Sequence, residues 1–323
     1  MAESFDKQYV IGIDVGGQTT KMGVVDARGQ VLAQTVIRSD NYADADPYLD
    51  EVATALNKII NEAGVKGQVR GIGIGAPNGN YYTGMVEMAP NVIWAKNGSI
   101  PVAKMLSKRM KGIPVALTND ANAAAVGEMT YGAARGMKNF IMITLGTGVG
   151  SGIVINGEVV YGHDGFAGEL GHVRVVRSNG RQCGCGRFGC LEAYCSAIGV
   201  ARTAREWLEM GDEPSLLRGL DNISSKDVYD AAKQGDALAL RVFAYTGRIL
   251  GEAFADFIAF SAPEAIVLFG GLARSKEFLT GPITEAMNNN VLGIWKDKVQ
   301  LVYSSLKESD AAILGASALA WEL

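Results

Sequence analysis

The sequence feature that most constrains the fold is a pattern that occurs twice along the chain. In each copy, a predicted strand rich in β-branched residues enters a glycine-rich turn, and two more predicted strands follow. The strands are predicted over 8–15, 20–27 and 30–37 in the first copy and over 138–146, 150–156 and 157–161 in the second. This repetition predicts a duplicated fold with a cleft between its two halves.

Helices and strands alternate after each of these runs, which predicts mostly parallel sheets of an α/β fold. Apolar residues from Leu49 to Ile60 recur at helical spacing, and Gly64 ends that pattern. Further helices are predicted over 101–111, 121–129 and 309–321, strands over 69–76, 114–118, 264–269 and 298–303, and a mostly helical region over 196–260. Because 323 residues exceed the roughly 100–200 typical of one domain, two domains are expected.

Charge and hydropathy exclude several classes of protein. The net charge of −4 and the lack of a long basic run argue against nucleic-acid binding through phosphate neutralisation. Apolar runs such as residues 265–270 are far shorter than the ~20 residues of a membrane-spanning helix. The first residues carry no signal-peptide core, and four cysteines do not make a secreted disulfide framework. A soluble cytoplasmic protein without nucleic-acid or membrane partners is therefore expected.

The first glycine-rich turn lies in the sequence DVGGQTTK. Its two glycines allow the backbone to approach a ligand closely, and consecutive N–H groups there can bind a phosphate. The aspartate at the strand end could hold Mg²⁺ through water, and the threonines and lysine offer further donors. The alternative is a β-hairpin with a glycine turn that binds nothing. The candidate cofactor-binding residues of this turn are Asp14, Gly16, Gly17, Gln18, Thr19, Thr20 and Lys21.

The second glycine-rich turn, LGTGVGSG, spans residues 145–152. It is neither a Walker loop nor a dinucleotide-binding fingerprint, because no helix opens after its last glycine. Two phosphate-binding turns in equivalent places of a repeat point to one nucleotide site that both halves serve. The candidate residues of the second half are Gly146, Thr147 and Gly148, with Gly270 and Gly271 after a later strand as space for an adenine or ribose.

Asp120 lies where a predicted strand ends and an alanine-rich helix begins. The side chain could simply cap that helix, which is common for aspartate. A carboxylate beside a phosphate site also suits a general base that accepts a hydroxyl proton during phosphoryl transfer. The neighbouring Asn119 and Asn122 make the segment more polar than a helix cap requires.

Glu169, His172 and Glu192 are candidate ligands for a polyhydroxyl substrate, although each residue type is more often a surface or structural residue. Three cysteines occur between His172 and Glu192, in the stretch QCGCGRFGC. A disulfide between the first two would close a strained ring, and a redox pair would more often be Cys-x-x-Cys. A closed structural Zn²⁺ site of Cys3His type fits the spacing, with buried free thiols as the alternative. Its ligands would be His172, Cys183, Cys185 and Cys190.

Together these segments resemble the ROK family of bacterial sugar kinases and sugar-responsive repressors, within the actin/hexokinase superfamily. The resemblance covers nearly the whole chain. It is carried by DVGGQTTK at 14–21, GAPNG at 75–79, NDAN at 119–122, LGTGVGSG through GELGH at 145–172, CGCGRFGCLE at 183–192 and FGG at 269–271.

The resemblance implies an α/β fold of two ribonuclease H-like domains that flank a deep cleft. The small N-terminal domain would comprise residues 1–118 plus 309–323, and the large C-terminal domain residues 119–308 with a zinc-binding loop at 172–190. Asp120 would take the proton from a sugar hydroxyl. The other sugar-binding residues would be Gly79, Asn119, Glu169, His172 and Glu192.

Two residues and the length of one segment depart from the family pattern. Gln18 stands where the first phosphate loop usually has threonine, and Asn78 replaces a glycine in the sugar-pocket segment. Asparagine tolerates unusual backbone angles, so the turn at Asn78 is expected to survive. The segment from His172 to Cys183 is one residue longer than is common, which a loop can absorb.

The activity implied is that of an ATP-dependent hexose kinase, a glucokinase that phosphorylates the 6-hydroxyl of glucose, with ATP, Mg²⁺ and structural Zn²⁺ as cofactors. Kinases for N-acetylmannosamine, N-acetylglucosamine, fructose or allose remain alternatives, as does polyphosphate as the donor. A non-catalytic sugar-sensing regulator is disfavoured, because only 13 residues precede Asp14. A homodimer or higher homo-oligomer is implied by the resemblance alone.

Overall fold

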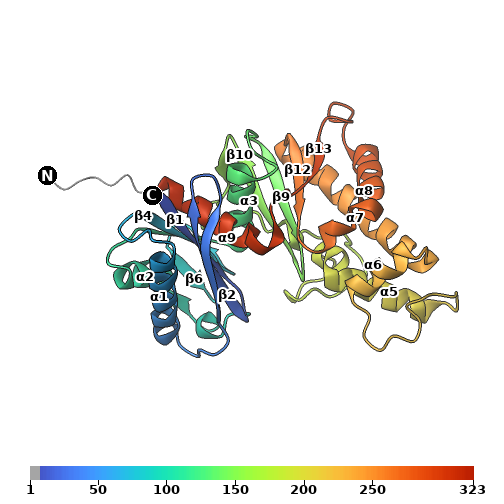
Figure 1. The fold of residues 1–323 in the computed structure, drawn as a ribbon. Helices are drawn as coiled ribbons and strands as arrows, with labels where there is room; N and C mark the ends of the chain where they lie inside the picture. The colour runs from blue at the N-terminus through green and yellow to red at the C-terminus, as the bar shows by residue number, and fades with distance from the viewer. Residues whose placement is uncertain (1–7) are drawn as a thin grey trace. The chain divides into compact units, whose positions relative to one another are not determined.

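The computed structural model describes residues 8–323, except for the side chains of residues 308 and 309. Contacts divide the chain into two units (Figure 1). The first unit contains the described residues up to Met137, together with Gly157–Gly168 and Ser305–Leu323; the second contains Lys138–Asn156 and Glu169–Ser304. By these contacts the segment after residue 118 stays with the first unit as far as Met137. The domain boundaries predicted from the sequence, after residue 118 and before residue 309, are a different division and stay a prediction.

The sheet of the first unit has the strand order β3-β2-β1-β4-β8. Its strands are β1 (Tyr9–Val15), β2 (Thr19–Asp26), β3 (Val31–Arg38), β4 (Val69–Gly75) and β8 (Val115–Thr118). The first three strands pair antiparallel, as the hairpin turns require, whereas β4 is parallel to both β1 and β8. The parallel strands therefore end at one edge of the sheet.

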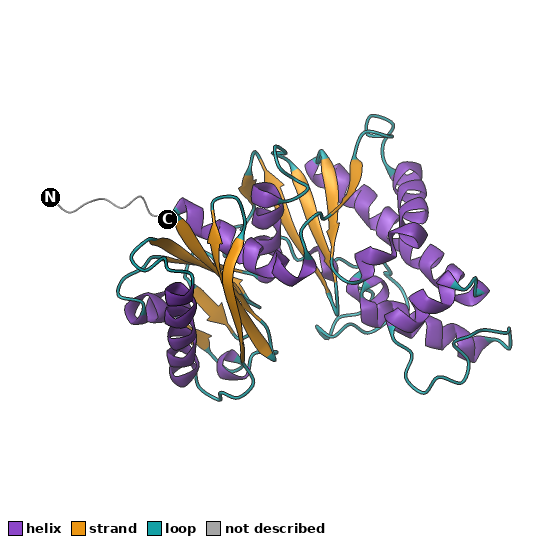
Figure 2. Cartoon of the chain, viewed as in Figure 1, coloured by secondary structure: helices purple, strands orange, loops and turns teal. Residues whose placement is uncertain are grey.

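Helices pack on this sheet (Figure 2). Helix α1 (Ala45–Glu62) buries the predicted apolar positions from Leu49 to Ile60 and so confirms that helix. The remaining helices are α2 (Val102–Arg109), α3 (Asp120–Tyr131) and α9 (Glu308–Ala318), with short 3-10 turns η1 (Ile93–Ala95) and η4 (Leu319–Glu322). A small sheet was not predicted: β5 (Gly79–Asn80), β6 (Met85–Glu87) and β7 (Ser99–Ile100). Its strands are too short to show alternation in the sequence.

Helix α9 lies directly on the backbone of the first sheet because two strand glycines leave room for it. A Cβ atom at Gly12 would overlap the carbonyl oxygen of Ile313, and one at Gly73 would overlap that of Ala316. Glycine in a strand interior is unfavourable by itself, so it marks a place where another backbone approaches closely. The glycines of β1 and β4 thus explain how the end of the chain joins the first unit.

A second sheet repeats the same order, β11-β10-β9-β12-β13; its strands belong to the second unit, except β11, which falls in the segment Gly157–Gly168. Its strands are β9 (Phe140–Leu145), β10 (Val149–Ile155), β11 (Glu158–Val159), β12 (Ala265–Phe269) and β13 (Gln300–Tyr303). Strand β10 pairs antiparallel with β9, whereas β12 is parallel to β9 and β13. The predicted duplication of the strand–turn–strand pattern is therefore confirmed, although β11 is shorter than predicted.

The predicted helical region of the second unit consists of several helices around one core. These are α4 (Glu192–Cys195), α5 (Ala197–Met210), α6 (Ser225–Lys233), α7 (Ala237–Ser261) and α8 (Lys276–Asn290), with 3-10 turns η2 (Leu170–His172) and η3 (Leu272–Ser275). Buried side chains of β9 and β12, such as Ile141 and Leu268, pack with Phe243 and Phe254 of α7. Among the described residues, no helix is long and apolar enough to cross a membrane.

We predict that Gly73→Ala destabilises the protein, since the added methyl group would push α9 away from the sheet. The loss in free energy of unfolding should be about 1–3 kcal/mol, the usual cost of overpacking. Urea unfolding followed by fluorescence measures it. Gly98→Ala is the matched control, because a Cβ at Gly98 meets no atom within 4 Å. Equal stability of the two variants would contradict this account of α9.

Candidate active site

The polar candidate site residues of the first unit lie where its parallel strands end. Asp14 of β1 lies beside Gly75 of β4, and Gly75 lies beside Thr118 of β8, according to the strand register. Asn119 and Asp120 follow Thr118 directly. Ligands of open α/β sheets bind at the carboxyl ends of the strands, so this edge is the expected place for a site. The parallel register brings Asp14 and Asp120 together although more than a hundred residues separate them.

The first glycine-rich turn is a tight connection between β1 and β2. The N–H of Gly16 donates to the carbonyl oxygen of Thr19 over 2.9 Å, which closes the turn. Gln18 is exposed at its tip. The hydroxyl of Thr20, by contrast, is completely buried and lies 2.9 Å from Ser39 Oγ and 2.7 Å from Tyr48 Oη. Thr20 thus supports the turn from inside, and its hydroxyl is not positioned to donate to a ligand, unlike the sequence-based interpretation.

Asn119, not Asp120, caps helix α3. Its Oδ1 atom accepts the backbone N–H groups of Ala121 (2.8 Å) and Asn122 (3.1 Å). One oxygen of Asp120 also accepts the Ala121 N–H over 2.9 Å, while the side chain stays accessible to solvent. Because the cap is already supplied, the Asp120 carboxylate is not needed for that purpose. The capping explanation for Asp120 is therefore not required, and an accessible carboxylate remains at the sheet edge.

The two carboxylates at this edge are electrostatically unusual. Burial and the charge of Asp120 raise the pKa of Asp14 to about 6, although Lys21, its cross-strand neighbour, lowers it. Desolvation also raises the pKa of Asp120, even though this side chain is accessible; the backbone hydrogen bond from Ala121 lowers it in part. A carboxyl group whose pKa moves toward neutral pH is a better proton acceptor than an ordinary one. Perturbed carboxyl groups also mark functional sites more often than chance.

The GAPNG segment turns back against the same edge. Ala76 N–H donates to the carbonyl oxygen of Thr118 over 2.9 Å, and Gly79 packs so closely that a Cβ would overlap this oxygen. Asn78 has a φ of 51°, and its Nδ2 donates to the carbonyl oxygens of Glu87 (2.9 Å) and Met88 (3.2 Å). The expectation that asparagine preserves this turn is therefore confirmed, since its side chain also ties down the segment that follows.

In the second unit, the turn between β9 and β10 is held mainly by backbone contacts. Gly146 N–H donates to Gly148 O over 3.0 Å, and Gly146 O accepts the N–H of Ala197 over 2.8 Å. Thr147 is exposed at the tip. At the base of the turn, Val149 N–H donates to Glu192 Oε2 over 3.0 Å. A predicted substrate-binding carboxylate thus contacts a predicted phosphate-binding turn, which the sequence did not indicate.

His172, Cys183, Cys185 and Cys190 form a compact cluster in which one ligand atom from each lies within 4.8 Å of all the others. Cys183 Sγ is 3.7 Å from His172 Nδ1, and Cys185 Sγ is 3.8 Å from Cys190 Sγ. An ion at about 2.3 Å from tetrahedral thiolates places neighbouring sulfurs about 3.8 Å apart, so these residues fit Zn²⁺. The cluster uses Nδ1 of His172, which leaves Nε2 on the opposite side of the ring.

The cysteine loop is held by backbone ladders and one arginine. Cys183 N–H donates to Arg187 O over 2.8 Å, and isolated bridges join Arg174 to Cys190 and Gln182 to Phe188. The Arg181 guanidinium contacts Glu206 of α5 over 2.5 Å and lies over the ring of Tyr194. The fourth cysteine, Cys195, is fully buried and packs as a small apolar side chain, as expected. Glu169 is exposed just before η2, on the same segment as His172.

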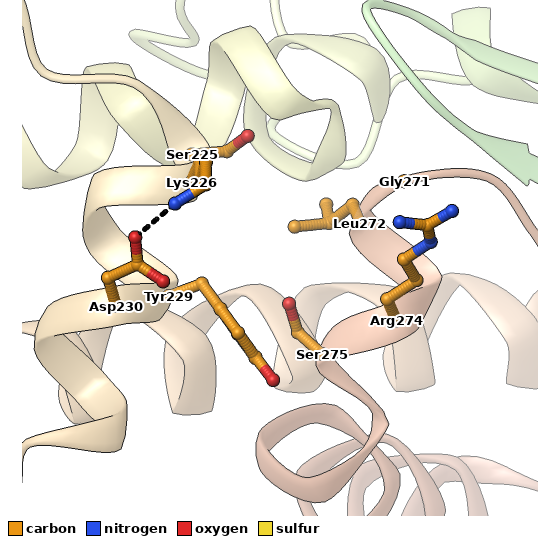
Figure 3. Close-up of a pocket in the computed structure, with 8 residues that line it drawn as sticks. All are labelled: Ser225, Lys226, Tyr229, Asp230, Gly271, Leu272, Arg274 and Ser275. Atoms are coloured by element: carbon orange, nitrogen blue, oxygen red, sulfur yellow. Dashed lines mark hydrogen bonds and ion pairs between the residues drawn. The ribbon is translucent and has the colours of Figure 1, made fainter.

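Gly271 opens onto a cavity of about 430 Å³. Figure 3 shows side chains of α6 on one side of it and those of η3 on the other. They are Ser225, Lys226, Tyr229 and Asp230 from α6, with Leu272, Arg274 and Ser275 from η3. This volume lies within the roughly 300–1,000 Å³ of small-molecule sites. Sequence reasoning found only the glycines here; the α6 residues carry no motif, and helical periodicity alone could not place them beside Gly271.

Two copies of one sheet with a glycine-rich turn after the first strand, together with a Cys3His cluster, define the class of the actin/hexokinase-type sugar kinases and their relatives. The family model of the ROK family matches residues 10–322. The chain therefore belongs to the ROK family, and the resemblance found in the sequence is confirmed.

The chain is similar to a glucokinase of Halalkalibacterium halodurans, with 37% identity over 315 residues, 96% of this chain and 94% of the relative. It is also similar to the crystal structure of a ROK family glucokinase from Streptomyces griseus in complex with glucose and AMPPNP. The identity is 33%, the match covers 98% of this chain and 100% of the glucokinase chain, and the TM-score is 0.78. A ROK family transcriptional regulator, a homologue of the Escherichia coli MLC protein, has a TM-score of 0.86 at 28% identity, and the match covers 97% of this chain and 78% of the regulator.

We predict that Cys190→Ser abolishes binding of Zn²⁺, because three ligands cannot close a structural site. The wild-type protein should contain stoichiometric zinc by plasma mass spectrometry, and the variant almost none. Cys195→Ala is the matched control, since Cys195 lies outside the cluster and should leave the zinc content unchanged. A wild-type protein that is purified and reconstituted without retaining zinc would contradict the assignment.

Proposed function

We propose that this protein is an ATP-dependent glucokinase that transfers the γ-phosphate of ATP to the 6-hydroxyl of glucose. The observation that carries the proposal is the accessible Asp120 carboxylate with its raised pKa, at a strand edge it shares with Asp14. The similarity to glucokinases, one of which was crystallised with glucose and AMPPNP, supports this substrate and this donor.

Asp120 is the general base in this proposal. It accepts the proton of the sugar hydroxyl as the oxygen attacks the γ-phosphorus, and ADP leaves in line. Gly79 and the amide group of Asn119 line the sugar on the first unit, since only the Oδ1 atom of Asn119 is used by the helix cap. On the second unit, Glu169, Glu192 and His172 Nε2 are the proposed ligands of the remaining hydroxyls.

Both glycine-rich turns bind the phosphates in this proposal. The N–H groups of Gly16 and Gly146 close their own turns, so the proposed backbone donors are those of Gly17 and Thr19 in the first turn and of Thr147 and Gly148 in the second. Asp14 holds the Mg²⁺ that accompanies ATP, and Lys21 adds a positive charge next to it. The cavity beside Gly271 is the proposed place of the base and ribose, because its volume suits a small molecule and polar as well as apolar side chains line it.

A structural Zn²⁺ held by the Cys3His cluster would supply no chemistry of its own, because all four positions are filled by protein atoms. Binding through Nδ1 would fix the ring of His172 and keep its proton on Nε2, from which His172 would donate to a sugar hydroxyl. Loss of the metal should therefore weaken sugar binding rather than the chemical step.

A sugar-sensing regulator is the second candidate, because a ROK transcriptional regulator shares the fold. The raised pKa of Asp120 and the intact first turn favour the kinase, since a sensor needs neither a base nor a bound γ-phosphate. We propose glucose as the substrate, ahead of N-acetylated hexoses, fructose or allose, because the chain is similar to glucokinases. A panel of these sugars with ATP and Mg²⁺, in which phosphorylation is measured directly, separates the candidates.

We predict that Asp120→Asn lowers kcat by about 10²–10⁴-fold, the usual contribution of a general base. Glucose affinity, measured by calorimetry, should change little because asparagine keeps the shape and the hydrogen-bonding reach of the side chain. Asp221→Asn, on an exposed loop of the second unit, is the control and should retain full activity. Unchanged turnover of Asp120→Asn would remove Asp120 from the mechanism.

The acid limb of the pH profile is expected to depend on Mg²⁺. Asp14, with a pKa of about 6, becomes neutral as the pH falls through 6 and then loses its attraction for the cation. Because Mg²⁺ and protons compete for the carboxylate, kcat/KM should fall below about pH 6 at low Mg²⁺, and this limb should move to lower pH at high Mg²⁺. Profiles at two Mg²⁺ concentrations measure the shift. A limb that does not move with Mg²⁺ contradicts the role of Asp14.

A further inference from the structure

In the second unit, the backbone of Val149 is held at both its N–H and its carbonyl oxygen by segments that carry proposed sugar ligands. Its N–H donates to Glu192 Oε2 over 3.0 Å. Its carbonyl oxygen packs against Gly171, where a Cβ would overlap it, and Gly171 directly precedes His172. The second phosphate-binding turn is therefore built on the residues that are proposed to bind the sugar.

The contact between Glu192 and the turn is close as well as hydrogen-bonded. A Cβ atom at Gly148 would overlap Glu192 Oε2, so glycine is required there as long as the carboxylate occupies this place. At Gly146, two residues earlier, a Cβ would meet nothing within 4 Å. The tight packing is thus specific to the side of the turn that faces Glu192.

The carboxylate of Glu192 has two oxygens with different neighbours. Oε2 accepts the N–H of Val149, and Oε1 accepts a hydrogen bond from the Cys183 thiol over 3.4 Å; as a Zn²⁺-bound thiolate, Cys183 would have no proton to donate, and Oε1 would be open to a sugar hydroxyl. Glu192 is only half-buried, so its carboxylate can rotate unless both oxygens are occupied. A sugar hydroxyl that donates to Oε1 would restrain this rotation and keep Oε2 on Val149.

We propose that Glu192 is a positioning residue that couples the sugar to the nucleotide within the second unit. Bound sugar orders the Glu192 carboxylate, the carboxylate orders the Val149 peptide, and the turn then binds the nucleotide phosphates at a lower entropic cost. Thermodynamic reciprocity requires that the nucleotide also tightens sugar binding by the same factor. The inference rests on the proposed function, because it needs both ligands to bind this chain.

The test measures the affinity for the β,γ-imido analogue of ATP by calorimetry, with and without saturating glucose. Wild-type protein should bind the analogue about 5- to 10-fold more tightly with glucose, at the lower end of typical coupling. Glu192→Ala removes both oxygens, so neither the Val149 N–H nor the sugar hydroxyl keeps this acceptor. Its ratio should fall to near one. Because glucose is saturating, weaker glucose binding by the variant does not enter the ratio.

Gly148→Ala tests the same contact from the side of the turn, and it leaves Glu192 and the cysteines unchanged. The added methyl group displaces the carboxylate, so this variant should also lose the coupling. In a Glu192→Ala background the obstacle is gone, and Gly148→Ala should then have little further effect on nucleotide affinity. Gly146→Ala is the matched comparison. The change in nucleotide affinity that Gly146→Ala causes should be the same whether residue 192 is glutamate or alanine.

The outcomes separate this inference from the proposed function. If wild-type protein phosphorylates glucose but binds the analogue equally well with and without it, the inference is overturned and the glucokinase assignment stands. Full coupling in both Glu192→Ala and Gly148→Ala, or additive effects of these two substitutions, also overturns the inference. A wild-type protein that binds neither ligand overturns both.

Discussion

Each half of the candidate site depends on parallel strand pairing that brings distant strand ends to a common edge. In the first unit, the register places Asp14 beside Gly75 and Gly75 beside Thr118, so that Asp120 follows at the same edge. In the second unit, Phe269 pairs with Thr144, and the turn at Gly146 and the glycines after Phe269 therefore lie at one edge. Side chains at such an edge are held by the ladder behind them, yet remain open to a ligand.

The electrostatic character of the first edge follows from this geometry. Asp14, Asp120 and Lys21 lie close together at a partly desolvated edge. The free energy of ionising the two carboxyl groups is therefore higher there than in water. Because the pKa of Asp14 is raised to about 6, its charged form is less favourable in the folded protein than in water. Such an arrangement is useful when a divalent cation and a substrate proton arrive, because each relieves the unfavourable charge. The helix cap supplied by Asn119 keeps Asp120 out of a purely structural role.

The second edge is organised by a loop that has no apolar core of its own. Phe188 is the one large apolar side chain within the QCGCGRFGC stretch, and it is exposed. The loop is held instead by backbone ladders, by the Arg181 contacts with α5 and by the ligand set that fits Zn²⁺. It ends at Glu192, whose carboxylate reaches the turn between β9 and β10. The Cys3His cluster, a proposed sugar ligand and a proposed phosphate-binding turn are thus connected by short contacts within one unit.

The alternation of strands and helices, the duplicated turns and the Cys3His ligand set could all be predicted from the sequence, because they depend on neighbouring residues and fixed spacing. The small sheet of β5, β6 and β7 was not predicted from the sequence, because strands of two or three residues are too short to show an alternating pattern. The folded structure was needed to show that Thr20 faces the interior, that Asn119 caps α3, and that Tyr229 and Ser275 line one cavity. It was also needed to show that Glu192 contacts Val149. The orientation of a side chain is set by atoms from segments far away in the chain, and no local pattern encodes it.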